Sequence, residues 1–280
     1  MKELLSIVII ATLFTFSSCR NSDRDRDVST QSSEEFWIAS NHFNTLMREI
    51  HKVAQVDSVL NNIAVADALK PNICNDSIVR TPNLGPYPIE LTIFYSDNTI
   101  CEGERNRNGK IIATFSGPYS KLGTVITIRT KDYKVDDFSV SADIVMTVVK
   151  QNIDTLKFDV KIQNGIITDN SKPGNKASKM SGDFIFMNYA GRKTIPTDDD
   201  KFIIRGKGTG TATNGVIYTA ESQFEFILKP SCNYETFGSF TLNAPNTLER
   251  IGNFGEGGEC DSKMLVTIAP ANGDQVVEIP

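Results

Sequence analysis

The chain has 280 residues, 40% of them hydrophobic, and a formal net charge of −5 at pH 7. This composition is sufficient for a real hydrophobic core and fits one large β domain or two small ones. Because recognition of nucleic acid needs a basic surface, the mild acidic excess predicts no nucleic-acid partner.

The first residues of the chain predict a signal for export. Residues 4–16 are mostly apolar and carry no charge. They are too few to span a bilayer, which takes about 20 residues, but they suit the apolar region of a secretory signal peptide. We therefore expect residues 1–18 to be a signal peptide.

The segment Phe16-Ser17-Ser18-Cys19 resembles the lipobox of bacterial lipoproteins. The resemblance implies that Cys19 is acylated, with palmitate among its chains, and becomes the first residue of the mature protein. It also implies that this lipid binds the outer membrane, with the protein on the periplasmic face or at the cell surface. The alternative is an ordinary signal peptide that happens to be followed by a cysteine.

Residues 19–33 are polar, with acidic and basic side chains alternating over residues 23–27. Such a stretch cannot bury apolar surface, so it predicts a disordered tether. Charged residues behind a lipidated cysteine resemble the surface-export signals of Bacteroidota lipoproteins. Those signals are mainly acidic and this stretch is mixed, so both membrane faces stay open.

A helical segment is expected over residues 34–70. Ser32 and Glu35 have the spacing of a capping box, and apolar residues then recur at helical spacing as far as Ala54. This pattern predicts an amphipathic helix over residues 32–54 that docks on the sheet. The alternative is a helix that binds a partner or a membrane surface.

Two further features belong to this segment. A second helical piece is predicted over residues 57–69, with Pro71 stopping it. The two histidines of the chain, His42 and His51, fall on opposite sides of the first helix. We therefore expect that they do not share a metal.

From Cys74 onward the hydrophobic pattern changes to period two, which predicts an antiparallel β domain over residues 71–280. We expect an all-β meander of about a dozen strands, built as a sandwich, an open barrel or a curled, half-barrel-like sheet. The pairs that indicate turns between strands are Asn108-Gly109, Asn164-Gly165, Asn214-Gly215 and Asn272-Gly273.

Four cysteines remain besides Cys19, and in an exported protein an even number indicates disulfides. Two stretches look alike: each begins with a cysteine, continues as strand, turn and strand, and ends in a cysteine followed by an acidic residue. We infer that each pair closes its own unit, as Cys74–Cys101 and Cys232–Cys260.

Residues 101–112, 115–119, 123–128 and 255–261 resemble an uncharacterised family of Bacteroidota lipoproteins. The resemblance covers about residues 74–280. It implies a secreted all-β lipoprotein and no particular activity, because no activity is assigned to the family.

Two motifs contain residue types that are found in ligand-binding sites. The glycines of Gly206-Lys207-Gly208-Thr209-Gly210 fall on one face of a predicted strand, which favours close approach of another backbone over phosphate binding. The approaching element is expected to be the helix over residues 36–54. Asp198-Asp199-Asp200 could supply oxygens to calcium, but a solvated turn is the preferred interpretation.

No catalytic, cofactor-binding or metal-binding residue is predicted. The β region has no histidine to activate a nucleophile, and the only tryptophan, Trp37, lies on the predicted helix. We expect a lipid-anchored cell-envelope protein with a non-enzymatic binding or structural role, toward an envelope protein or glycan. The alternatives are a carrier of a lipid or other apolar ligand in a curled sheet, and a carboxylate-dependent polysaccharide hydrolase.

Overall fold

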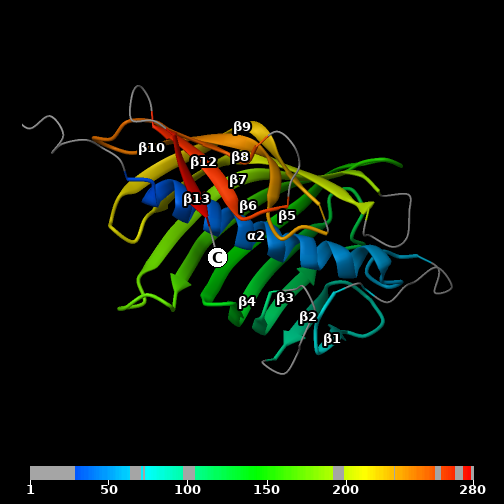
Figure 1. Cartoon of the computed structure of the whole chain (residues 1–280). Coiled ribbons are helices and arrows are strands. Elements are labelled where there is room, and N and C mark those ends of the chain that lie inside the picture. The colour runs from blue at the N-terminus through cyan, green and yellow to red at the C-terminus, as the bar shows by residue number, and fades with distance from the viewer. Residues whose placement is uncertain are drawn as a thin grey trace, which may run out of the picture.

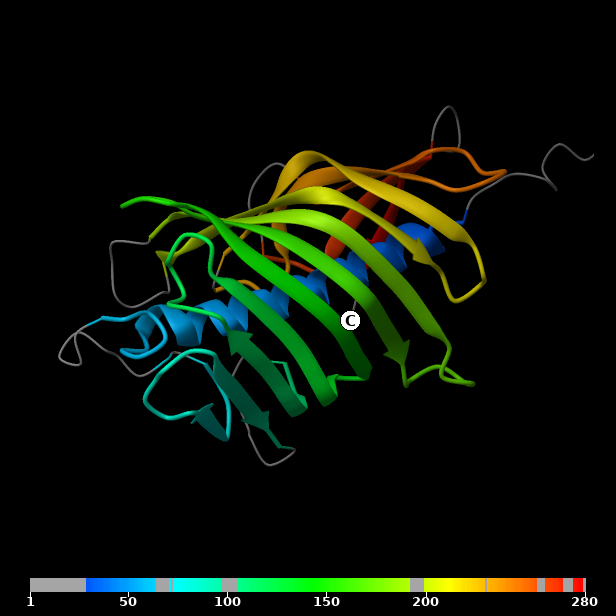
Figure 2. The same ribbon diagram turned by 180° about the vertical axis from the view of Figure 1, so that it is seen from behind.

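The computed structural model describes residues 29–63, 71, 73–96, 105–191, 199–229, 231–255, 260–268 and 274–278. Within these ranges the chain forms one helix and one sheet of 13 strands, which follow each other in sequence order as an antiparallel meander. The sheet is not closed. It curls around the helix, which runs along its concave side (Figures 1 and 2).

The helix α2 spans Gln31–Val56. The strands are β1 (Ser77–Thr81), β2 (Ile89–Tyr95), β3 (Arg107–Phe115), β4 (Val125–Val135), β5 (Phe138–Gln151), β6 (Leu156–Asp169), β7 (Ala177–Ala190), β8 (Lys201–Thr211), β9 (Ile217–Leu228), β10 (Glu235–Asn243), β11 (Arg250–Asn253), β12 (Lys263–Ile268) and β13 (Asp274–Glu278). The predicted fold, an all-β meander with an N-terminal helix docked on it, is confirmed.

The start of α2 differs from the prediction in its capping. Thr30 is the N-cap residue and its side chain makes no capping hydrogen bond, so the predicted capping box is wrong. The Glu35 carboxylate instead accepts a hydrogen bond from the backbone N–H of Thr213, 2.7 Å away. Because α2 already begins at Gln31, residues 31–33 are helical and do not belong to a disordered tether.

The helix ends at Val56, and residues 58–62 form a turn where a second helical piece was expected. Asp57 stops the helix because its backbone is extended and its carboxylate accepts hydrogen bonds from the backbone N–H groups of Val59 and Leu60, each at 2.9 Å. Arg80 of β1 pairs with the same carboxylate at 2.8 Å. The remainder of that predicted piece, residues 64–69, lies outside the described residues.

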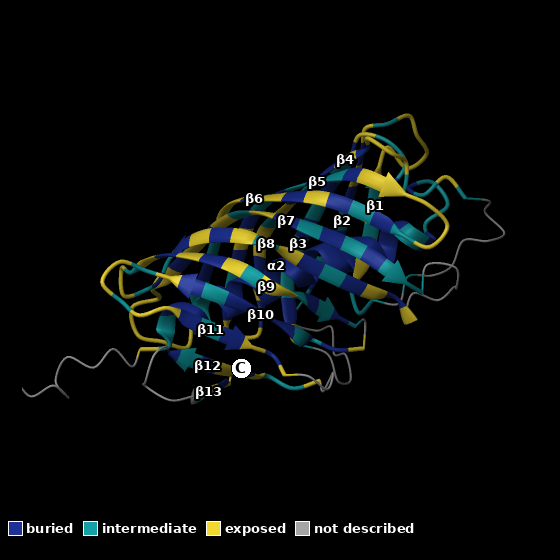
Figure 3. Cartoon of the chain, turned by 90° about the horizontal axis from the view of Figure 1, so that it is seen from above, coloured by how far each residue is buried: buried dark blue, intermediate teal, exposed yellow. Residues whose placement is uncertain are grey.

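Burial alternates along the long central strands, as Figure 3 shows. Period-two hydrophobicity therefore identified the concave face correctly, since side chains alternate between the two faces of a strand. The buried side chains of β5 and β6 are Phe138, Val140, Ala142, Ile144, Met146, Val148, Leu156, Phe158, Val160, Ile162 and Ile167.

Only some of the Asn-Gly pairs form turns. Asn214-Gly215 connects β8 to β9, as predicted. Asn164-Gly165 and Asn108-Gly109 lie inside β6 and β3, at register shifts of the strand pairing, so they form bulges rather than hairpin turns. Asn164 and Gly109 have positive φ values of 51° and 89°, and the left-handed backbone that favours Asn and Gly in hairpin turns also occurs in one type of bulge. Asn272-Gly273 lies outside the described residues.

The close approach of α2 to the sheet occurs at Gly165. A Cβ atom on Gly165 would lie 2.7 Å from the ring of Phe43 on the helix and 2.5 Å from the carbonyl oxygen of Met180. The prediction that α2 covers the glycines of residues 206–210 is wrong. The rings of Phe184 and Tyr218, which belong to the sheet, occupy the space that those glycines leave.

The predicted disulfide Cys232–Cys260 is present. Cys74 is also disulfide-bonded. Its predicted partner Cys101 lies outside the described residues, so that pairing stays a prediction. Both predicted strand–turn–strand units exist as antiparallel hairpins, β1–β2 and β10–β11, near opposite ends of the sheet.

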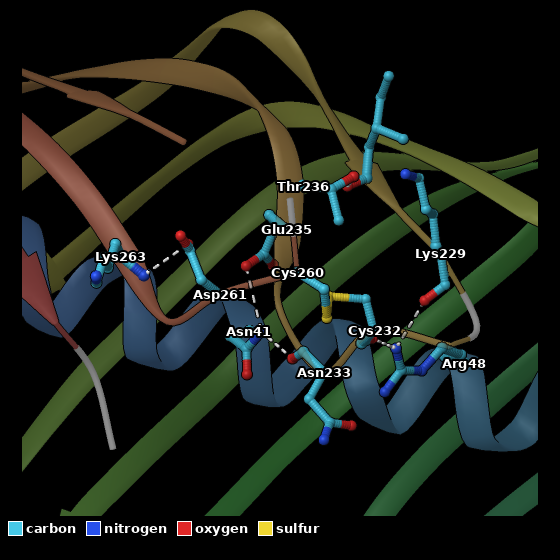
Figure 4. The surroundings of a disulfide bond; sticks show 11 residues. Asn41, Arg48, Lys229, Cys232, Asn233, Glu235, Thr236, Cys260, Asp261 and Lys263 are labelled. Carbon is cyan, nitrogen blue, oxygen red and sulfur yellow. Dashed lines mark hydrogen bonds between the residues drawn. A yellow bond between two sulfur atoms is a disulfide. The ribbon is translucent and has the colours of Figure 1, made fainter. Parts of the chain in front are cut away.

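The disulfide holds the connection between β9 and β10 against the polar side of α2 (Figure 4). Glu235 accepts hydrogen bonds from the indole N–H of Trp37 at 2.9 Å and from the Asn41 and Asn44 amides at 3.2 and 3.0 Å. Arg48, one helical turn further, donates to the backbone carbonyl of Cys232. The predicted amphipathic helix therefore has a polar side that is buried, not solvated.

A second polar contact fixes α2 near the other end of the sheet. Glu49 of α2 pairs with Arg107 of β3 at 3.1 Å, and the two side chains are 1% and 3% exposed. Burial by itself would raise the pKa of Glu49, but the charges of Arg107, Lys52 and Arg48 outweigh it and lower the pKa. The carboxylate thus stays ionised inside the protein, and its stabilisation depends on Arg107.

We expect Gly165→Ala to destabilise the fold by about 1–3 kcal/mol, the usual effect of overpacking a filled core. The added methyl group would have to displace the Phe43 ring or the strand backbone. Gly85→Ala is the matched control, because a Cβ atom on Gly85 meets no atom within 4 Å. Urea unfolding of both variants gives the two free energies, and equal values would contradict the close approach.

Arg107→Met should lower the free energy of unfolding by about 3 kcal/mol, because it removes the nearer partner of the buried Glu49 charge and leaves the farther one, Lys52, at 3.7 Å. The control is Arg205→Met, which removes an exposed arginine paired with Glu225 at 3.3 Å. Such surface pairs contribute about 0–1 kcal/mol. Chemical denaturation compares the two, and a small effect at Arg107 would show that the pair does not hold the helix.

Candidate functional site

A pocket of about 330 Å³ opens where α2 begins. The β8–β9 connection lies beside the helix at this end of the molecule, and the β6–β7 connection lies at the same end, as Figures 1 and 2 show. The lining residues are Glu35, Ile38, Phe138, Ile167, Asp169, Lys172, Pro173, Lys176, Ser178 and Thr213.

The floor of the pocket is apolar. Ile38 comes from α2, Phe138 from the start of β5 and Ile167 from β6, and each is less than 9% exposed. Pro173 of the β6–β7 connection lines the same pocket. An apolar floor with a few polar groups at the rim is the usual composition of a small-molecule site.

The two carboxylates at the rim already have partners within the protein. Glu35 accepts hydrogen bonds from the Thr213 backbone and hydroxyl and from the Gln31 amide. Asp169 accepts from the backbone and hydroxyl of Ser171 and pairs with Lys172 at 3.1 Å. These bonds outweigh the effect of burial and lower the pKa of Asp169. Both carboxylates are therefore structural acceptors in this arrangement.

The rim also carries hydrogen-bond donors that are not fully used by bonds within the protein. Lys172 uses one of its three N–H groups on Asp169, and the bond raises its pKa. Among the described residues, Lys176 has no ion-pair partner, although it lines the same pocket. Ser178 adds a hydroxyl group to the wall. The unused hydrogen-bonding capacity at the rim thus belongs mainly to donors.

The pKa of one acidic group beside the pocket is raised, unlike that of Asp169. Glu34, in the first turn of α2, is half-buried, and this burial raises its pKa. Lys172 acts against the shift, while the neighbouring carboxylates Glu35 and Asp169 add to it. A cluster of three acids and two lysines surrounds an apolar floor, which would suit an amphipathic ligand.

A buried histidine lies on the other side of Phe138, with the two ring centroids 5.1 Å apart. His42 is buried, and burial lowers its pKa well below the usual value, helped by the charges of Arg105 and Arg107. The ring is therefore held in the neutral form behind the pocket floor.

The second histidine lies in another polar cluster, which sequence reasoning missed. His51 Nε2 lies 2.9 Å from Asp200 Oδ2, and His51 Nδ1 lies 2.7 Å from the hydroxyl of Tyr119. Asn188 donates to the second oxygen of Asp200 at 2.8 Å. The arrangement resembles a catalytic dyad in its order of groups, but His51, Asp200 and Tyr119 are each at most 1% exposed. It therefore links the helix to the sheet.

Of the acidic run at residues 198–200, which was expected to be a solvated turn, this cluster corrects the expectation for Asp200, whereas Asp199 is exposed. Asp200 is buried and committed to His51 and Asn188. Asp198 lies outside the described residues. Within the described ranges, no group of three or more His, Cys, Asp or Glu side chains could hold a metal ion. The sequence offered no signal for the pairing, because a histidine of the helix meets an acid 149 positions further along the chain.

The other residues singled out in the sequence do not line the pocket. Cys19 is outside the described residues. Trp37 is fully buried, so its ring is not exposed to a ligand. Among the described residues, no helix is long and apolar enough to cross a membrane. No family model, curated protein or solved structure matches this chain.

The neutral state of His42 predicts a pH dependence of stability. Below about pH 6.5 the histidine of the unfolded chain takes up a proton that the folded protein excludes, so the free energy of unfolding falls as the pH falls. His42→Phe should remove this contribution. Between pH 7 and pH 5 its free energy of unfolding should fall by about 2 kcal/mol less than that of the parent chain.

Chemical denaturation at several pH values measures this difference. The parent chain is the control, and the slope with pH is the readout, so a uniform change of stability in the variant does not interfere. Identical slopes for the two chains would show that His42 titrates normally in the folded protein.

Proposed function

We propose that the chain is a lipid-anchored cell-envelope protein with a non-enzymatic binding role. The observation that carries the binding role is the pocket at the start of α2, with its apolar floor and charged rim. Sites for small molecules are usually concave, mainly apolar and largely formed before binding, and this pocket meets that description.

The location in the envelope is supported by the cysteines. Cys232 and Cys260 form a disulfide and Cys74 is disulfide-bonded as well. Such bonds persist in oxidising compartments and are rare in the cytosol. Together with the apolar residues 4–16 and the lipobox-like segment ending at Cys19, they favour export and lipid attachment.

The length of the intervening chain bears on where the pocket would lie. Ser29 is the first described residue, and it immediately precedes the end of α2 that borders the pocket. The residues between Cys19 and Ser29 can extend over about 35 Å at most, at about 3.5 Å per residue. In a lipidated protein, the pocket would therefore lie within about one protein diameter of the bilayer.

The two alternative functions have less support. A carrier that holds its ligand inside the curled sheet would have to displace α2, whose polar side chains are bonded to the strands. A carboxylate-dependent hydrolase would need acids free to exchange protons with a substrate. In the pocket, Glu35 and Asp169 are occupied by bonds within the protein.

The anchor has a direct test. We expect Cys19→Ser to abolish labelling of the chain by radioactive palmitate in a bacterial host and to release the protein from the membrane fraction. The reason is that only the thiol of Cys19 would accept the lipid. Cys101→Ser is the control, since it removes a cysteine and keeps the lipobox-like segment. A mature wild-type chain whose Cys19 thiol is unmodified by mass spectrometry would overturn lipid anchoring.

A further inference from the structure

We infer that the pocket at the start of α2 binds a carboxylic acid with an apolar tail of about ten carbons, the carboxylate lying at Lys176 and Lys172 and the tail on the apolar floor. This inference rests on the proposed binding role and names the ligand class for the same pocket. It follows from the hydrogen-bonding capacity at the rim, the depth of apolar lining and the volume.

The first step concerns the polar end of the ligand. The rim carboxylates Glu35 and Asp169 have their oxygens engaged by Thr213, Gln31, Ser171 and Lys172. The lysines are the groups with unused bonds: Lys176 has no ion-pair partner among the described residues, and Lys172 spends one N–H on Asp169. A ligand with hydrogen-bond acceptors, and not one with donors, can use the free N–H groups of these lysines.

A cationic head group fits the same rim poorly. To pair with a lining carboxylate, it would have to displace Lys172 from Asp169, or the Thr213 backbone from Glu35, and it would then lie beside Lys176. Glu34, the third acid beside the pocket, is not part of its lining. A carboxylate requires no such exchange, because charge-assisted hydrogen bonds from lysine to carboxylate add to the existing pair.

The second step concerns the tail. Ile38, Phe138 and Ile167 form an apolar floor beneath the lysines, so a ligand must present apolar surface below its charged end. The pocket volume of about 330 Å³ corresponds to about eleven groups the size of a water molecule or methylene, at about 30 Å³ each. A linear acid of about ten carbons therefore fills the pocket, and a shorter acid leaves part of the floor wet.

The test uses the chain from residue 19 onward with Cys19→Ser, which retains every described residue and needs no detergent. Isothermal titration calorimetry with decanoate is compared with two probes of equal tail length, decanol and decyltrimethylammonium, below their micellar concentrations. We expect decanoate to bind about tenfold more tightly than decanol, and decyltrimethylammonium to bind more weakly than both.

Three variants locate the binding. Lys176→Gln should weaken decanoate about tenfold and leave decanol unchanged, while Lys179→Gln, an exposed lysine of β7 outside the pocket lining, should change neither. Ser178→Leu should block all three probes by filling the pocket. Near-ultraviolet circular dichroism checks that each variant is folded, and Lys176→Gln keeps the test decisive if Ser178→Leu does not fold.

The outcomes separate the ligand class from the binding role. If decanol or decyltrimethylammonium binds as tightly as decanoate, the carboxylate inference is overturned while the pocket remains a binding site. If decanoate binds equally to the Lys176→Gln and Lys179→Gln variants, the lysine does not recognise it and the inference is also overturned. If none of the three probes binds, both the inference and the binding role at this pocket fail.

Discussion

The curl of the sheet depends on the helix that fills its concave face. Thirteen strands in one open meander twist and coil, and their inner face carries large apolar side chains that must be covered. Helix α2 covers them, but it also brings Asn41, Glu49 and His51 into the interior. Because an unpaired polar group is costly away from water, the helix is held in one position, in which Glu235, Arg107 and Asp200 face these groups.

The position of α2 in the sheet also decides where a pocket opens. Along most of α2 the side chains are buried against the sheet and the β9–β10 connection. At the first turns of α2, residues of the helix and of the β6–β7 connection line a pocket with an apolar floor. The helix fills the hollow of the curled sheet, so this pocket lies at the end of the helix and not in the hollow.

Sequence patterns predicted the helix and the strands better than the contacts of individual residues. Period two marked the long strands and period 3.6 marked α2, because these periods report which side of an element is buried. The capping box predicted at Ser32 and the hairpin turn predicted at Asn164-Gly165 were wrong, because the residues of these motifs make other contacts in the structure. The Glu35 carboxylate is used by a distant loop, and the glycine makes room for Phe43 inside a strand. The disulfide Cys232–Cys260 was predictable because its hairpin is local in the chain.

By itself, the sequence determined the all-β class, the meander, the docked helix and the pairing of two cysteines, since each depends on periodicity or on neighbours in the chain. Only the tertiary structure decided which polar groups of α2 are buried, which acids meet His51 and Trp37, and where the pocket opens. These depend on contacts between residues more than a hundred positions apart. Such contacts follow from how far the sheet curls around the helix, and no local pattern encodes that curvature.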